Sequence, residues 1–154
     1  MTLTIDFMSL YNEKIMEHFA NPKNLGKLDK PDAKATVGNP QCGDVFSLYL
    51  KIDPSTGSGQ DIMESKIADI KFETLGCVAA ISVSSMVTEI AKGKTLAQAE
   101  KIDFQDINKE LGFLPPVKVH CAQMAIRALR KAIENYKIKN QELRIKNKRL
   151  IISN

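Results

Sequence analysis

The sequence lacks any apolar run approaching the ~20 residues that a membrane-spanning helix requires. Its first residues carry neither the basic segment and apolar stretch of a secretion signal nor the arginines of a mitochondrial transit peptide. We therefore expect a cytoplasmic protein with no membrane partner. The balance of 44% hydrophobic and 26% charged residues is ordinary for a soluble globular domain, and a chain of 154 residues can build one hydrophobic core without a covalent staple.

Cysteine is also scarce, with three residues in the whole chain. The number is odd and the residues lie far apart, which excludes the small disulfide-rich folds of secreted proteins. This favours metal binding or thiol chemistry over disulfide formation as the role of the cysteines. A lone free cysteine is most often a small buried hydrophobe, so the case depends on all three together. They are Cys42, Cys77 and Cys121.

The formal net charge of +4 is concentrated at the C-terminal end, where six basic residues face one acid, Glu142. We expect residues 1–136 to form a single domain and residues 137–154 to form a basic extension, as a solvated helix or an arm. Binding of nucleic acid by this extension is the less favoured interpretation. The basic residues are Lys137, Lys139, Arg144, Lys146, Lys148 and Arg149.

Local patterns in the first half of the chain predict one helix followed by strands. Tyr11, Ile15 and Phe19 recur at helical spacing after Ser9, the expected N-cap, and the helix should end at Asn21. The segment 31–36 is expected to be a polar connector. Apolar residues alternate from 44 to 52 and again around Ile70 and Phe72, as in half-buried strands, with a turn-rich loop at 53–60 between them.

The second half is predicted to be helical. Helical spacing from Val83 to Ala91 ends at Gly93, and a capping-box pattern at Thr95 starts a short helix. The prolines of residues 114–117 interrupt any helix, and Cys121 opens a last long one. Strands followed by helices indicate an α+β fold, with a small antiparallel sheet of about three strands covered on one face by helices.

The three cysteines share one kind of position. Cys42 lies in a turn before a predicted strand, whereas Cys77 and Cys121 lie at predicted helix starts. Unpaired N–H groups at a helix start stabilise a thiolate, which is the form that binds soft metals. Gly43 and Gly76 stand beside two of the cysteines and leave room for a bulky ligand.

Two other ligand types accompany the thiols, Asp44 two residues after Cys42 and His120 just before Cys121. On spacing alone, each of the two is as easily explained as an ordinary hydrogen-bonding residue. Three sulfurs with a carboxylate or an imidazole suit an iron-sulfur cluster, and zinc accepts the same set. A zinc-bound regulatory or structural domain is therefore the alternative, and a thiol enzyme using Cys121 and His120 ranks third.

Four ordered segments resemble the U-type iron-sulfur cluster assembly scaffolds, the family that includes IscU and the N-terminal domain of NifU. The resemblance runs from about Leu10 to Tyr136 and rests on residues 11–22, 37–44, 72–77 and 114–121, which hold all three cysteines. Val78-Ala79-Ala80 stands where family members usually have Gly-Ser-Ala. His120 and the short interval from Cys77 to Cys121 favour the IscU type over the SufU type.

The resemblance implies a scaffold and not a turnover enzyme. It implies a cluster, most simply 2Fe-2S, built on Cys42, Cys77 and Cys121 with Asp44, His120 or a residue of another chain as the fourth ligand. It also implies sulfur from a cysteine desulfurase, electrons from a ferredoxin, an iron donor, recipient apo-proteins, and a homo-oligomer when the cluster is held. An Hsp70/Hsp40-type chaperone pair would read the segment Leu114, Pro115, Pro116, Val117 and Lys118.

Cys121 is expected to be the persulfide acceptor. It combines a helix start with Lys118 and His120, which can supply positive charge or a proton. Cys77 has the apolar neighbours Val78 and Ala79, and the acidic Asp44 beside Cys42 opposes thiolate formation there. The resemblance implies the same choice, since the third cysteine is the usual acceptor in IscU-type scaffolds.

Overall fold

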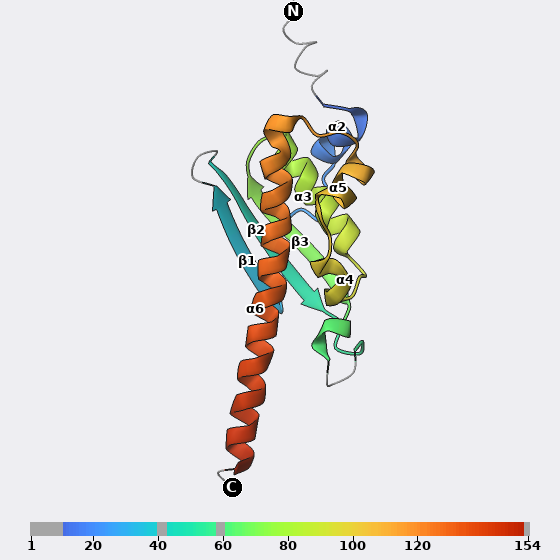
Figure 1. The fold of residues 1–154 in the computed structure, drawn as a ribbon. Coiled ribbons are helices and arrows are strands. Elements are labelled where there is room, and N and C mark those ends of the chain that lie inside the picture. The colour runs from blue at the N-terminus through green and yellow to red at the C-terminus, as the bar shows by residue number, and fades with distance from the viewer. Residues whose placement is uncertain (1–10, 40–42, 58–60, 153–154) are drawn as a thin grey trace, which may run out of the picture.

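A three-stranded antiparallel sheet forms one layer of the protein (Figure 1). The computed structural model describes residues 11–39, 43–57 and 61–152. Strands β1 (Ala33–Asn39), β2 (Asp44–Ile52) and β3 (Ile67–Leu75) follow one another in the sheet in chain order. The α+β fold with about three antiparallel strands is therefore confirmed.

Strand β1 corrects one expectation, because residues 31–36 were predicted to be a polar connector. The strand starts at Ala33, and its alternate side chains Ala33, Ala35 and Val37 are buried opposite Leu50, Leu48 and Phe46 of β2. Alanine is a weak hydrophobic signal, and the intervening Lys34 and Thr36 made the segment look polar. The segment forms a strand because it pairs with β2, and the local residue pattern does not reveal that pairing.

Helices cover one face of the sheet (Figure 1). Helix α6 (Val119–Ile152) packs across β1 and β2, and α3 (Val78–Ala91) packs against β3 and α6. Helix α2 (Glu13–Ala20) lies against α3. The alternating Phe46, Leu48, Leu50 and Ile52 of β2 and the stripe Ala122, Ala125, Leu129, Ala132 and Ile133 of α6 are buried in this core.

The short elements complete the layer of helices. They are the 3-10 turn η1 (Ile62–Glu64), the helices α4 (Leu96–Glu100) and α5 (Phe104–Leu111), and the 3-10 turn η2 (Pro116–Lys118). The predicted capping box at Thr95 and Gln98 is present at α4. Helix α5 was not predicted, although its buried residues Ile107 and Leu111 are four residues apart and Asp103, its N-cap, forms a second capping box with Asp106 of its first turn.

Helix α6 continues well past the sheet. From Gln141 to Ile152 every residue is exposed, and the predicted boundary between residues 136 and 137 falls within the helix without a break. That boundary stays a prediction. Among the described residues, no helix combines the length and apolar character needed to cross a membrane.

The N-cap of α2 is Asn12, whereas the expected cap, Ser9, lies outside the described residues. Asn12 Oδ1 accepts a hydrogen bond from the backbone N–H of Ile15 at 2.9 Å, and its Nδ2 donates to the carbonyl of Leu111 at 2.9 Å. Gly112 follows with φ of +82°, and a Cβ on it would lie 2.5 Å from Asn12 Nδ2. One asparagine therefore caps α2 and joins it to the end of α5.

We predict that Asn12→Ala lowers the free energy of unfolding by about 1–2 kcal/mol, because one cap and one tertiary hydrogen bond are lost together. Urea denaturation measures the change. Asn147→Ala on the exposed part of α6 is the matched control and should alter stability by less than about 0.5 kcal/mol. Equal effects of the two variants would contradict this role for Asn12.

Candidate metal centre

Three elements bring their ends together at the candidate site. Asp44 is the first residue of β2, Cys77 is the N-cap of α3 directly after the end of β3, and Cys121 lies in the first turn of α6. The register pairs Val45 with Leu75, which puts the start of β2 beside the end of β3. Cys42 lies outside the described residues, so its expected place in the site stays a prediction.

Asp44, His120 and Cys121 form a compact donor set. One ligand atom from each lies within 4.8 Å of the other two. The Sγ of Cys121 lies 3.7 Å from Asp44 Oδ2 and 3.5 Å from His120 Nε2, and His120 Nε2 lies 3.9 Å from Asp44 Oδ2. A thiol, an imidazole and a carboxylate at this spacing can bind zinc or the irons of a cluster.

Gly76 makes room for the carboxylate of Asp44. A Cβ at this position would lie 3.0 Å from Asp44 Oδ1 and 2.7 Å from the Cβ of Ala80, so any side chain would force its neighbours apart. Asp44 itself is only 5% exposed. Gly76 was predicted to leave room for a bound ligand. In the structure it leaves that room for the carboxylate of Asp44, one of the protein's own donor groups.

Cys77 and Lys118 complete the surroundings of Cys121. Cys77 is half-buried, and its thiol is near enough to Cys121 to raise the pKa of that residue. Partial burial alone would lower the pKa of Lys118, but Cys77 and Tyr11 outweigh it and the pKa is raised. Burial, and then the charge of Cys77, raise the pKa of Tyr11 against the opposing effect of Lys118. Lys118 therefore stays charged beside the thiols.

The direction expected for the pKa of Cys121 was wrong. The helix start was expected to favour a thiolate, but burial, followed by Cys77 and Asp44, raises the pKa of Cys121 far above its ordinary value. The Cys121 side chain is fully buried. Asp44 was expected to oppose a thiolate at its sequence neighbour Cys42, and in the fold its carboxylate contacts Cys121, 77 residues away.

The proline segment is divided between core and surface. Leu114 is buried, whereas Pro116 and Val117 are exposed on the turn η2. Pro115 and Lys118 are half-buried. Phe113, which directly precedes this segment, was not among the expected site residues. Its side chain is exposed in the structure, which the sequence alone does not reveal.

Comparisons with known proteins match most of this chain to one protein family. Residues 10–143 match the sequence family described as NifU-like N terminal domain. This chain belongs to that family. It is 45% identical over 134 residues to an iron-sulfur cluster assembly scaffold protein, IscU 1, of Archaeoglobus fulgidus, covering 87% of this chain and 81% of the relative. The IscU scaffold protein of Haemophilus influenzae is 45% identical over 132 residues, covering 84% of this chain and 97% of the relative.

A solved structure supports the fold of the family. The crystal structure of the N-terminal part of a nitrogen-fixing NifU-like protein from Brucella abortus superimposes with a TM-score of 0.64. It is 23% identical and covers 86% of this chain and 98% of the other. The resemblance seen in the four sequence segments is therefore confirmed at the level of family and fold.

We predict that a small alkylating reagent modifies Cys77 faster than Cys121 in metal-free protein, by roughly tenfold or more, because thiolate fraction and access control thiol reactivity. Cys77 is half-buried, whereas Cys121 is fully buried with a raised pKa. Timed labelling with iodoacetamide followed by peptide mass spectrometry measures both rates in one sample. Unfolding in urea is the control and should bring the rates together. Faster labelling of Cys121 in the folded protein would contradict the geometry.

Proposed function

We propose that this chain is a scaffold on which an iron-sulfur cluster is assembled and from which it passes to apo-proteins. The observation that carries the proposal is the donor set of Asp44, His120 and Cys121, with Cys77 near enough to raise the pKa of Cys121. The names of the relatives, iron-sulfur cluster assembly scaffold proteins, support the same role. The cluster is cargo in this proposal, so the chain acts as a carrier and not as a turnover enzyme.

The mixed nature of the donors favours assembly followed by release. Thiolates of Cys42, Cys77 and Cys121 would bind iron strongly, whereas a fourth position held by Asp44 or His120 supplies a harder oxygen or nitrogen donor. A fourth cysteine would hold a cluster more firmly than either. Exchange at Asp44 or His120 therefore provides a route by which a recipient's thiolate enters the coordination shell.

Zinc binding is the second candidate function, because a thiol, an imidazole and a carboxylate within 4.8 Å of one another also suit a tetrahedral zinc site. The two candidates differ in inorganic sulfide. A cluster contains acid-labile sulfide in proportion to its iron, whereas a zinc site contains none. Analysis of both elements in one sample therefore separates the two functions.

We predict that the wild-type chain, reconstituted anaerobically with iron and sulfide, binds both, and that Cys42→Ser, Cys77→Ser and Cys121→Ser each lower bound sulfide by more than about half. His120→Gln should alter the absorption spectrum of the cluster if His120 is a ligand. The matched control is His18→Gln, since His18 contacts Ser85 Oγ at 2.7 Å, away from the donor set. Zinc without sulfide in the wild type would contradict the scaffold function.

Sulfur delivery is proposed to occur at Cys121. The outer sulfur of a persulfide on a cysteine desulfurase would transfer to the Cys121 thiol, which leaves a thiol on the desulfurase and a persulfide on Cys121. Cys121 contacts Asp44 and His120 and lies near Cys77, so sulfur placed there lies among the groups that would bind iron. Because Cys121 is buried, the segment containing Lys118 and His120 must move when the desulfurase docks.

We predict that a desulfurase supplied with cysteine places the first persulfide on Cys121, although a free alkylating reagent reaches Cys77 first. The protein is freed of metal, incubated for short times, quenched by alkylation and mapped by mass spectrometry. Lys118→Gln should slow transfer several-fold, since it removes a charge beside the thiols. Lys109→Gln on α5 is the matched control. Early persulfide on Cys77 or Cys42 would refute the assignment and leave the scaffold function standing.

A further inference from the structure

The second half of α6 carries apolar side chains that nothing in the described part of the chain covers. Figure 1 shows this end of the helix running past the sheet. Three isoleucines recur there every seven residues, Ile138, Ile145 and Ile152, and all are exposed. Seven residues make nearly two helical turns, so the three side chains lie in one line along the helix. We call this line the isoleucine stripe.

Basic side chains outnumber acidic ones beside the isoleucine stripe. At 100° per residue, Lys148 lies about 60° to one side of Ile145 and Arg149 about 40° to the other, and Glu142, the one acid, lies about 60° away on the side of Arg149. Neither Lys148 nor Arg149 makes an ion pair with any residue that the structure describes. The stripe is therefore an apolar line beside two cations that have no ion-pair partner within the described ranges.

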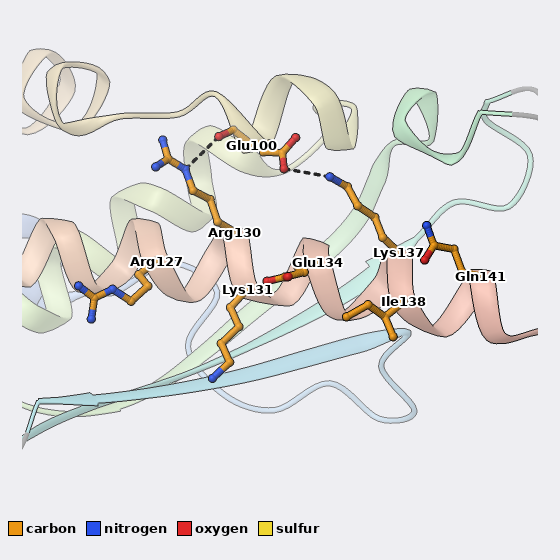
Figure 2. Close-up of a pocket in the computed structure, with 8 residues that line it drawn as sticks. All are labelled: Glu100, Arg127, Arg130, Lys131, Glu134, Lys137, Ile138 and Gln141. Carbon is orange, nitrogen blue, oxygen red and sulfur yellow. Dashed lines mark hydrogen bonds and ion pairs between the residues drawn. The ribbon is translucent and has the colours of Figure 1, made fainter.

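Ile138, the first residue of the stripe, also lines a groove beside α6 (Figure 2). The groove has a volume of about 550 Å³, and Ile138 is one of the residues that line it. Arg130 Nε donates to the carbonyl of Glu100 at 3.1 Å, and Lys137 Nζ lies 2.9 Å from Glu100 Oε1, so the two contacts tie α6 to the end of α4. The lining residues are Glu100, Arg127, Arg130, Lys131, Glu134, Lys137, Ile138 and Gln141.

The groove and the stripe share one face of α6. Arg127, Lys131 and Ile138 follow one another at four and seven residues, which are spacings of a single helical face. Four of the eight lining residues are basic and two are acidic. The basic character of the stripe's flanks therefore continues along the helix into the groove.

We propose that the isoleucine stripe and this groove form a docking surface for an acidic amphipathic helix of a partner protein. A single apolar line at heptad spacing can pack against the apolar face of another helix, and the charges beside the line select the partner. The positions three residues after Ile138 and Ile145 are Gln141 and Lys148, so the stripe is one apolar line and not the double seam of a coiled coil. The charges beside it are positive on balance, so they attract a helix bearing glutamates at its own flanking positions. The matched sequence family ends at residue 143, so Ile145 and Ile152 lie beyond it.

The same charges argue against other occupants. A second copy would bring Lys148 and Arg149 against equally basic flanks, which costs free energy. An anionic membrane favours a helix with its apolar residues on one face, but Leu143 and Leu150 form a second exposed line about 160° away from the stripe. A nucleic acid would leave the three isoleucines without apolar contact.

The test uses the full chain and a fluorescent synthetic helix of about three heptads with leucine at a and d and glutamate at e and g. Fluorescence anisotropy should show saturable binding. Ile145→Gln and Lys148→Glu should each weaken it by about tenfold, because each removes one contact of the stripe or its flank. Leu143→Gln and Lys139→Glu are the matched controls on the other faces, and each should change the dissociation constant by less than about threefold.

Several results would overturn the proposal. One is no saturable binding, and another is equal weakening by Lys148→Glu and Lys139→Glu, which would indicate attraction without a site. Tighter binding to phosphatidylglycerol vesicles or duplex DNA at the same salt would assign the surface to those ligands. A wild-type dimer in sedimentation that Ile145→Gln converts to a monomer would assign it to a second copy. Circular dichroism verifies that each variant keeps its helices, and none of these residues belongs to the donor set.

Discussion

A buried carboxylate is the constraint around which the candidate site is built. Asp44 is nearly inaccessible, and burying a charged group costs free energy unless it is paired or hydrogen-bonded. Its neighbours are the thiol of Cys121 and the imidazole of His120, neither of which carries a permanent charge. Iron or zinc bound at this group would supply the compensating charge.

Gly76 and the sheet register hold that carboxylate in place. The pairing of Val45 with Leu75 fixes the start of β2 against the end of β3, and Gly76 follows directly. Because no side chain occupies this point, Asp44 can lie against the backbone that leads into Cys77. The packing of α6 on β1 and β2 then brings Cys121 to the same end of the sheet. Strand and helix ends therefore position the donors that lie within the described ranges.

The sequence predicted the elements whose signal is local. Alternation revealed β2 and β3, the Thr95 capping box revealed α4, and the start of α6 at Cys121 was correct to within two residues. Strand β1 was not predicted, because its buried residues are mostly alanine. It is a strand because it pairs with β2, and not because of a local sequence preference. Asp44 and His120 were named as candidate ligands from their chemistry, and the structure places both beside Cys121, while their ligand role stays a prediction.

Contacts between residues that are far apart in the sequence could not be predicted from local sequence patterns. The helix-start argument treated Cys121 as solvated, and it ignored the burial that reverses the direction of its pKa. The contact of Asp44 with Cys121 joins residues 77 apart and depends on how α6 crosses the sheet. Desolvation and long-range charge therefore decide the electrostatics of this site, and neither is visible in the sequence around one cysteine.

Helix α6 links the donor set and the isoleucine stripe while keeping them apart. Cys121 and Ile145 are 24 residues apart on one uninterrupted helix, which corresponds to about 36 Å at 1.5 Å per residue. A partner held at the stripe would not cover the end of the sheet at which Cys77 and Cys121 lie. It would also raise the local concentration of any domain attached to it, because a tethered encounter replaces a diffusional one. A single long helix can therefore retain one partner at its far end while exchange proceeds at its first turn.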